Sequence, residues 1–320
     1  MTSLLDVRDL TKWYFLKKKS PIVKAVDGVS FTMNKGQVLG IIGESGCGKS
    51  TLGKMLVGIE KPTEGTIRFK NEITEHILKE NPLQFRRSCQ MIFQNPFDTF
   101  DPRDNVQRIL NTALKIHGIG NSKKERIDIS MKAMEDIGMK PARDYIYRYP
   151  HELSGGQLQR ISIIRSMLLN PELIIADEPV SMLDVSVRAD IINLLLELTK
   201  ERGAAMIFIS HDIATTRYIS DRVGVMYLGR IVEMGNTDDV IHNPKHPYTK
   251  VLISNCASID PLDKKNPIRI KGEPPTPVNT GPGCYFYPRC YKARERCKKE
   301  YPTMTNVGKE HFASCFYLEQ

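Results

Sequence analysis

The 320-residue chain contains no apolar run of the ~18–20 residues that a membrane-spanning helix needs. Its richest apolar stretch, from Ile161 to Leu169, is interrupted by Arg165. Asp6, Arg8 and other charged residues also stand too early for the apolar core of a secretion signal to form. Internal repeats and low-complexity tracts are absent as well. We therefore expect a soluble, cytosolic protein.

The composition excludes an intrinsically disordered chain, because 41% of the residues are hydrophobic and 26% are charged. The length suits one large domain with an appendage, or two domains. A formal net charge of +9 favours an anionic partner. That partner is a nucleotide, a nucleic acid or an acidic lipid surface, and charge alone does not choose among the three.

A glycine-rich loop follows Val38–Ile42, an apolar run with the pattern of a buried strand. From Gly43 to Ser50 the loop matches G-x4-G-K-S, and apolar residues at helical spacing follow it, the context that a phosphate-binding loop requires. Lys49 is expected to reach the β- and γ-phosphates, Ser50 to ligate magnesium and Thr51 to contact the α-phosphate. The predicted nucleotide-binding residues of the loop are Gly43, Ser45, Gly46, Cys47, Gly48, Lys49, Ser50 and Thr51. At Cys47 the field of the helix N-terminus favours the thiolate, but the main role expected of this position is that of a small residue that fits the turn.

A second apolar strand, Leu173–Ala176, ends in the two carboxylates Asp177 and Glu178. In α/β folds the carboxyl edge of the sheet is where ligands bind. An acidic pair after a strand is by itself more often a solvated strand end. Beside a phosphate-binding loop, Asp177 is expected to hold magnesium and Glu178 to polarise the attacking water.

The stretch from Leu153 to Gln157 reads Leu-Ser-Gly-Gly-Gln and precedes a helix predicted to run to about Leu169. Ser154 can cap that helix, leaving backbone N–H groups on the two glycines free to bind a second anion. An ordinary helix cap is the alternative. The residues concerned are Ser154, Gly155, Gly156 and Gln157.

With this motif the chain resembles the ATP-binding cassette (ABC) family, whose signature it is, from roughly Leu4 to Leu252. In that family the signature of one subunit covers the γ-phosphate held by another, so that ATP joins two subunits. The resemblance implies that Tyr14 stacks on adenine, with Trp13 or Phe15 as register alternatives. Gln94 matches the glutamine that senses magnesium and the γ-phosphate, and His211 matches the switch histidine. Residues Ser181–Asp184 resemble the D-loop, with Met182 in place of the commoner alanine. The catalytic residues implied are Glu178, His211, Gln94 and Lys49, and the magnesium ligands are Ser50, Gln94 and Asp177.

Within the family the chain resembles the ATPase subunits of oligopeptide, dipeptide and nickel importers, and is closest to their second, F-type ATPase. Arg148–Glu152, His246–Thr249 and Gly272–Pro275 carry this likeness. It implies a second ABC ATPase subunit in a hetero- or homodimer, two membrane permease subunits, an external substrate-binding protein acting indirectly, and a place on the cytoplasmic face of the membrane. Peptide is the expected substrate and a nickel or metal chelate the alternative.

The predicted fold is α/β, with a RecA-like P-loop NTPase core around a mostly parallel sheet. An N-terminal antiparallel β portion, an inserted α-helical subdomain at about residues 95–165 and a small cysteine-rich C-terminal domain complete it. Residues 1–255 are assigned to the nucleotide-binding domain and 256–320 to a linker and the cysteine-rich region. The expected strands are Val38–Ile42, Met91–Phe93, Leu173–Ala176, Ala205–Ser210 and Val223–Tyr227, and the expected helices are Val106–His117 and Lys123–Ile137, the latter capped by Ser122.

Four cysteines lie close together near the C-terminus, namely Cys284, Cys290, Cys297 and Cys315. A reducing cytosol argues against disulfides and favours a metal. The gaps match neither common zinc sites nor the usual ferredoxins, so spacing leaves zinc, iron–sulfur and no metal open. The resemblance implies a 4Fe-4S cluster held by these four thiols, with Zn²⁺ as the alternative, and a structural role for it.

Two other classes of function compete with an importer ATPase. A soluble ABC protein acting on nucleic acid is compatible with the net charge, but such proteins usually carry two cassettes or long coiled coils, so no nucleic-acid partner is expected. An iron–sulfur redox protein regulated by ATP would not need the water-activating Glu178 and the switch histidine His211.

Overall fold

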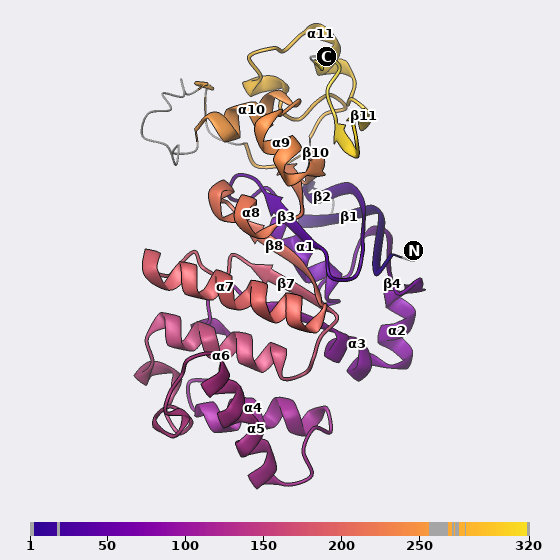
Figure 1. Ribbon diagram of the computed structural model, residues 1–320. Helices are drawn as coiled ribbons and strands as arrows, with labels where there is room; N and C mark the ends of the chain where they lie inside the picture. Colours follow the sequence, from indigo (N-terminus) through magenta and orange to yellow (C-terminus); the bar gives the residue numbers. More distant parts are fainter. Residues whose placement is uncertain are drawn as a thin grey trace. The chain divides into compact units, whose positions relative to one another are not determined.

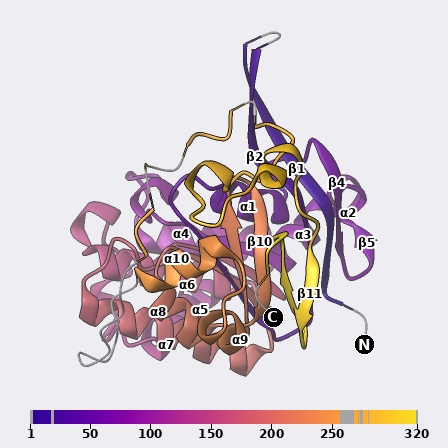
Figure 2. The same ribbon diagram turned by 90° about the horizontal axis from the view of Figure 1, so that it is seen from above.

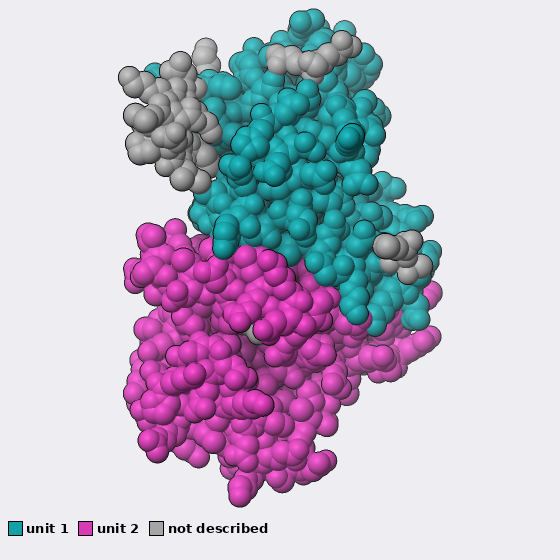
Figure 3. All heavy atoms as spheres, viewed as in Figure 1, with its two compact units in different colours: residues 1–73, 207–320 teal, residues 74–206 magenta. Residues whose placement is uncertain are grey.

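The computed structural model describes residues 3–17, 20–255, 268–270, 272, 275–278 and 280–318. It divides into two compact units, which Figure 3 shows in two colours. The first unit comprises residues 1–73 and 207–320, and the second comprises residues 74–206. Among the described residues, no helix has both the length and the apolarity to cross a membrane.

The first unit contains the N-terminal strands, the glycine-rich loop with its helix, and the C-terminal part of the chain (Figure 1). Its N-terminal elements are β1 (Leu5–Lys17), β2 (Ser20–Met33), β3 (Val38–Ile42), α1 (Lys49–Leu56), β4 (Glu64–Phe69) and β5 (Glu72–Ile73). Its later elements are β8 (Ala205–Ser210, from Ile207 on), α8 (Ile213–Ile219), β9 (Arg222–Tyr227), β10 (Arg230–Asn236), α9 (Thr237–His242), α10 (Pro247–Ser254), η4 (Tyr287–Arg289), α11 (Glu295–Lys299), β11 (Thr305–Gly308) and β12 (His311–Ala313).

An antiparallel sheet with the order β2-β1-β4-β5 forms the N-terminal part of this unit. Leu5 and Val7 of β1 are buried whereas Arg8 is exposed, the alternation expected of a strand with one face on the core. Figure 2 shows β1 and β2 as a long paired ribbon. The predicted N-terminal antiparallel portion is therefore present.

The second sheet of the first unit has the order β11-β12-β10-β9-β3-β8. All five residues of β3 are buried, and β3 pairs in parallel with β9, as the continuous apolar run Val38–Ile42 predicts. The core beside it is aromatic: the ring centroids of Tyr227 and Tyr248 lie 4.6 Å apart, and Phe286 lies 5.3 Å from Tyr227. Residues from β9, α10 and the C-terminal segment thus share one core.

The second unit is mostly helical and contains one parallel strand pair, β6 with β7. Its elements are α2 (Thr74–Glu80), α3 (Pro82–Ser88), β6 (Cys89–Ile92), η1 (Phe97–Thr99), α4 (Val106–Ile116), α5 (Lys123–Asp136), η2 (Ala142–Asp144), η3 (Pro150–Glu152), α6 (Gly155–Met167), β7 (Leu173–Asp177) and α7 (Val185–Arg202). Ser122 accepts a hydrogen bond from the backbone N–H of Glu125 at 3.1 Å, so the predicted cap of α5 is confirmed.

The predicted strands and the helices predicted at residues 106–117 and 123–137 are confirmed, with ends that differ by at most two residues. The compact units divide the chain at residues 73/74 and 206/207. The assignment of residues 1–255 and 256–320 to separate domains stays a prediction, as does the insertion at 95–165. Much of the predicted linker, together with Cys256, falls on residues 256–267, 271, 273–274 and 279, outside the described residues.

Candidate functional site

The glycine-rich loop together with the start of α1 (residues 43–51, here the phosphate loop) follows β3 in the first unit. Gly48 precedes α1 with φ 104°, in the left-handed region that favours glycine. A Cβ at Gly48 would lie 1.9 Å from the carbonyl oxygen of Ala25, and one at Gly43 would lie 2.2 Å from that of Met226. Both glycines of the G-x4-G-K-S motif are thus required, because neighbouring backbone leaves no room for a side chain.

Lys49 is buried at the start of α1, and its ammonium group turns back over the loop. Its Nζ donates to the carbonyl oxygens of Gly43 at 2.8 Å and Glu44 at 3.0 Å. Ser45 and Gly46 are exposed, whereas Ser50 and Thr51 are half-buried in the first turn of α1. The loop therefore has an exposed tip, a buried cation and hydroxyls at a helix N-terminus, an arrangement suited to binding a phosphate chain.

The expectation that Cys47 favours the thiolate is wrong. Its side chain is buried, with 3% exposed. Burial raises the pKa of the Cys47 thiol, and the nearby charge of Lys49 opposes this without reversing it. Cys47 is therefore a neutral thiol that fits the turn, the main role expected of the position.

Tyr14 and His211 also belong to the first unit. The Tyr14 ring on β1 is 38% exposed, and the Nζ of Lys12 lies 5.1 Å from its centroid. The alternative Phe15 is 62% exposed, and Trp13 is partly buried. His211 is exposed directly after β8, where Asp212 caps α8 by accepting from the N–H of Ala214 at 3.0 Å. Tyr14 is thus an exposed aromatic on β1 and His211 an exposed histidine at a strand end, and their roles stay predictions.

In the second unit, Gln94 and Glu178 are in direct contact: the Nε2 of Gln94 donates to the Oε2 of Glu178 at 3.1 Å. Glu178 follows β7 with φ 45°, an unfavourable conformation for a residue with a side chain. Its carbonyl oxygen accepts from the N–H of Ser181 at 3.2 Å and from its hydroxyl at 3.1 Å. Asp177, at the end of β7, is buried with 5% exposed. The strand end thus presents a buried carboxylate followed by an accessible one with an amide partner.

Ser154 caps α6 as predicted, in a reciprocal arrangement with Gln157. The Ser154 hydroxyl accepts from the Gln157 N–H at 3.3 Å, and the Gln157 side chain accepts from the Ser154 N–H at 3.0 Å. A Cβ at Gly156 would lie 2.7 Å from a methyl group of Val187. The helix ends at Met167, two residues before the predicted end. Gln157 is therefore occupied as a capping residue, and Gly156 lets α7 approach closely.

The four C-terminal cysteines all belong to the cysteine segment (residues 280–318) and are free thiols. The Cys284 N–H donates to the carbonyl oxygen of Cys297 at 2.8 Å. Burial, with a smaller contribution from the other three thiols, raises the pKa of Cys284 to about 12. The Cys290 and Cys315 pKa values are raised for the same reasons, chiefly burial. Within the described residues, however, no three His, Cys, Asp or Glu side chains are placed to hold a metal ion.

Two family sequence models match separate stretches of the chain. The sequence model of the ABC transporter family matches residues 26–181, and that of the oligopeptide/dipeptide transporter C-terminal region matches residues 232–297. A putative oligopeptide transport ATP-binding protein of Bacillus subtilis is 43% identical over 98% of this chain and 94% of its own length. The chain belongs to the ABC transporter family of ATP-binding proteins. The dipeptide transport ATP-binding protein of Escherichia coli is likewise 42% identical over 99% of this chain and 95% of its own.

Solved structures of ABC proteins share the fold. The ATP-binding cassette MJ0796, in a dimeric post-hydrolysis state with ADP and phosphate, has a TM-score of 0.66 and 26% identity over 73% of this chain and 98% of its own. CbiO1 of Clostridium perfringens has a TM-score of 0.63 and 28% identity over 75% of this chain and 91% of its own. This ABC protein is therefore a P-loop ATPase of α/β fold.

Two residues that contact the phosphate loop, Tyr248 and Arg289, were not predicted from the sequence. Tyr248 accepts a hydrogen bond from the Glu44 N–H at 3.0 Å, although 204 residues separate the two. Arg289 of the cysteine segment forms two hydrogen bonds with the Glu44 carboxylate, at 2.8 and 3.0 Å. Tyr248 lies in a stretch that carries the resemblance to peptide and nickel importers, but no local spacing links it to the loop. The loop also lines a 160 Å³ cavity together with residues 275–277.

Proposed function

We propose that this ABC protein is the ATP-hydrolysing subunit of an importer of dipeptides or oligopeptides. The observation that carries the proposal is a phosphate loop with a buried lysine in a chain whose relatives, over nearly its whole length, are named as peptide transport ATP-binding proteins. Those names favour peptide over nickel.

The proposed roles divide among a few side chains. Lys49 and the loop N–H groups bind the phosphates, while Tyr14 stacks on adenine. Glu178 polarises the attacking water, and its contact with Gln94 at 3.1 Å supports a joint role because the amide orients the carboxylate. His211 acts as the switch at the end of β8. Hydrolysis needs all of these, so loss of one should slow turnover without unfolding the protein.

Magnesium is expected with the bound nucleotide. A half-buried hydroxyl at Ser50, a buried carboxylate at Asp177 and the Gln94 amide supply the oxygen ligands that Mg²⁺ prefers, so the donor set fits this ion. When bound, the ion neutralises charge on the phosphates. The residues themselves hold the nucleotide and orient the water.

Partner subunits complete the proposed machine. Ser154, Gly155, Gly156 and Gln157 are proposed to act on ATP bound by a second ABC ATPase, identical or different. In the segment whose Leu183 and Val187 lie against the two glycines, the apolar side chains of Met182 and Val185 are 63% and 81% exposed, which supports a surface that another subunit covers. Two permease subunits are proposed to contact the helices of residues 95–165 at the cytoplasmic face of the membrane, with an external binding protein delivering substrate to them.

A 4Fe-4S cluster is proposed for Cys284, Cys290, Cys297 and Cys315. The four free thiols of this segment are a suitable donor set, because the other three lie close enough to Cys284 to contribute to its raised pKa. Four thiolates around one zinc ion stand only ~4 Å apart, given Zn–S bonds of ~2.3 Å. A four-iron cluster offers each thiolate its own iron and needs wider spacing than that. The cluster would staple a short basic segment.

Reconstitution tests the proposal. The chain is combined in vesicles with its permease, partner ATPase and binding protein, and ATP-driven uptake of labelled dipeptide, oligopeptide and nickel chelate is compared. Peptide uptake that is lost with Glu178→Gln is expected. Nickel uptake without peptide uptake would contradict the substrate, and retention on nucleic acid without co-purification of a permease would contradict the transport role.

A further inference from the structure

The cysteine segment reaches into the phosphate loop through one side chain, Arg289. Its guanidinium contacts both carboxylate oxygens of Glu44, Nη1 to Oε2 at 2.8 Å and Nη2 to Oε1 at 3.0 Å. The Arg289 side chain is 6% exposed and that of Glu44 is 25% exposed. A forked, largely buried ion pair of this kind fixes direction as well as distance. Nothing in the ATP-binding motifs themselves requires it.

Glu44 is held at its backbone too. Its N–H donates to the Tyr248 hydroxyl at 3.0 Å, and its carbonyl oxygen accepts from Lys49 Nζ at 3.0 Å. The carbonyl that orients the phosphate-binding lysine thus belongs to the residue that Arg289 holds. A shift of Glu44 would move the hydrogen-bonding partner of Lys49.

Glu44 also places a negative charge in a loop that binds a polyanion. Arg289 offsets that charge in a partly buried setting where solvent screens little. Without the guanidinium, the Glu44 carboxylate would repel the incoming phosphates. Loosening of the loop and charge repulsion therefore act in the same direction.

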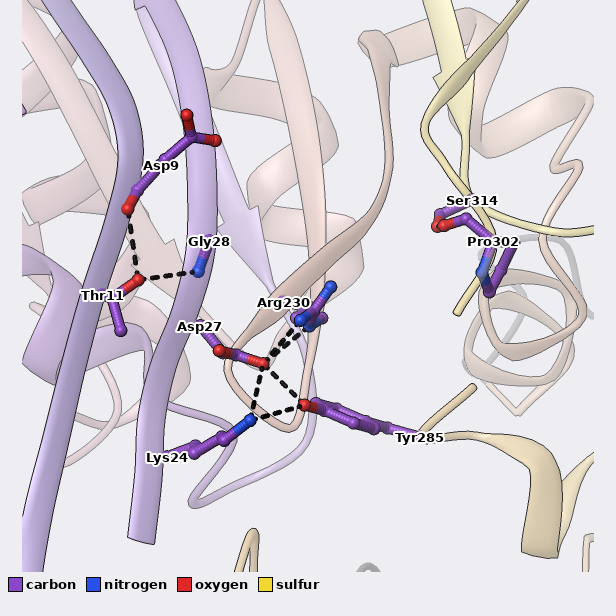
Figure 4. Close-up of polar contacts among 9 residues, drawn as sticks. All are labelled: Asp9, Thr11, Lys24, Asp27, Gly28, Arg230, Tyr285, Pro302 and Ser314. Atoms are coloured by element: carbon purple, nitrogen blue, oxygen red, sulfur yellow. Dashed lines mark hydrogen bonds and ion pairs between the residues drawn. The ribbon is translucent and has the colours of Figure 1, made fainter. Parts of the chain in front are cut away.

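A second contact joins the cysteine segment to β2 and β10 (Figure 4). The Tyr285 hydroxyl donates to Asp27 Oδ2 at 2.6 Å, and Arg230 pairs with the same carboxylate at 2.7 Å. Asp27 lies on β2 two residues after Ala25, whose carbonyl oxygen abuts Gly48 of the loop. Tyr285 follows Cys284 and Arg289 precedes Cys290, so both contacts are made by neighbours of cysteines.

We propose that Arg289 is a positioning residue of the ATP site, through which the cysteine segment holds the phosphate loop in its binding geometry and offsets the charge of Glu44. This rests on the proposed ATP-binding function. Arg289 acts through Glu44 and touches no reacting atom. Its removal should raise the Kd and the KM for ATP while leaving kcat at saturating ATP within about twofold.

The test uses the full chain and measures Mg²⁺–ATP binding by calorimetry together with ATPase kinetics. Arg289→Gln should raise Kd about tenfold, a free-energy difference of ~1.4 kcal/mol. The double variant Glu44→Gln/Arg289→Gln should recover the part of that loss that comes from charge repulsion, because the repelling carboxylate is gone, but not the part that comes from the loosened loop. The matched control is Arg296→Gln, which removes an exposed pair with Glu300 from the same segment and should bind ATP like wild type.

Each outcome decides between distinct ideas. A Kd within twofold of wild type for Arg289→Gln overturns the positioning role, and a double variant no better than the single one overturns the charge argument. If Arg289→Gln does not fold, Arg289→Lys replaces it, with an expected threefold rise in Kd because lysine lacks the fork; an unchanged Kd again overturns the role. Failure of wild type and Arg296→Gln to bind ATP would instead contradict the proposed function.

Discussion

His246 makes the stability of the first unit depend on pH. It is buried at the N-terminus of α10, where its Nδ1 accepts from the Tyr248 N–H at 3.0 Å. Burial lowers the pKa of His246 from 6.5 to about 4, against a smaller opposing effect of Glu233. The Glu233 carboxylate accepts a hydrogen bond from the backbone N–H of His246 at 2.8 Å, and its Oε1 lies 2.7 Å from Nε2 of His311. Protonation would therefore remove the cap of α10 and bury a charge.

The direction of the pH dependence follows from linkage. Above pH 6.5 His246 is neutral in folded and unfolded chains, and its contribution to stability is complete. Between pH 6.5 and 4 the unfolded chain binds a proton at His246 that the folded chain does not bind, so the stability of the folded state decreases as the pH decreases. Below pH 4 the contribution is lost and the effect levels off. A fall of the pKa from 6.5 to about 4 corresponds to ~3 kcal/mol, or a melting temperature lower by several degrees.

The assay is denaturant unfolding of wild type and His246→Asn at several pH values from 7.5 to 4. Asparagine keeps an N-cap oxygen but lacks the imidazole ring, so the variant is less stable than wild type at neutral pH. Because asparagine does not titrate, only wild type loses stability as the pH falls, and the difference between the two should shrink. His242→Asn replaces an exposed histidine of the same unit and is the control. Parallel profiles for wild type and His246→Asn from pH 7.5 to 4 would refute the reasoning.

Three further results are expected. Glu178→Gln should retain ATP binding but slow hydrolysis by ~10²-fold or more and accumulate an ATP-bound dimer, measured by ATPase assay and gel filtration; unchanged turnover in the assembled transporter would remove Glu178 from its role. Cys47 should react slowly with a bulky maleimide in native protein and quickly after unfolding, with ATP slowing it further; fast labelling indifferent to ATP would contradict its burial. Protein purified without oxygen should be brown, with broad absorbance near ~400 nm and about four irons per chain, and serine at any one of the four cysteines should expose the segment to protease; one zinc per colourless chain would identify the other metal, and a protected metal-free segment would contradict the staple.

Local sequence patterns predicted the elements that depend on local physics. The run Val38–Ile42 is a buried strand, and Ser122 and Ser154 cap their helices because the pattern of apolar residues and capping side chains is contained within a few positions. The motif also predicted glycine-dependent turns at Gly43 and Gly48. The group that excludes a side chain at Gly48, the carbonyl oxygen of Ala25, lies outside the motif.

Long-range contacts were beyond that reasoning. Glu44 meets Tyr248 and Arg289 across 204 and 245 residues, and no spacing rule joins them. Cys47 shows the opposite failure, because the helix field acts locally whereas its burial depends on the packing of the whole loop. Tertiary burial outweighed the local electrostatic effect there.

The backbone of Glu178 has a consequence for the balance between stability and activity. At φ 45° a residue with a Cβ costs roughly 1 kcal/mol or more relative to glycine. The fold would thus be relieved by glycine at the very position where the proposed reaction needs a carboxylate beside Gln94. Glycine at this position should therefore stabilise the fold while removing the carboxylate that contacts Gln94, so stability and the proposed reaction favour different residues here.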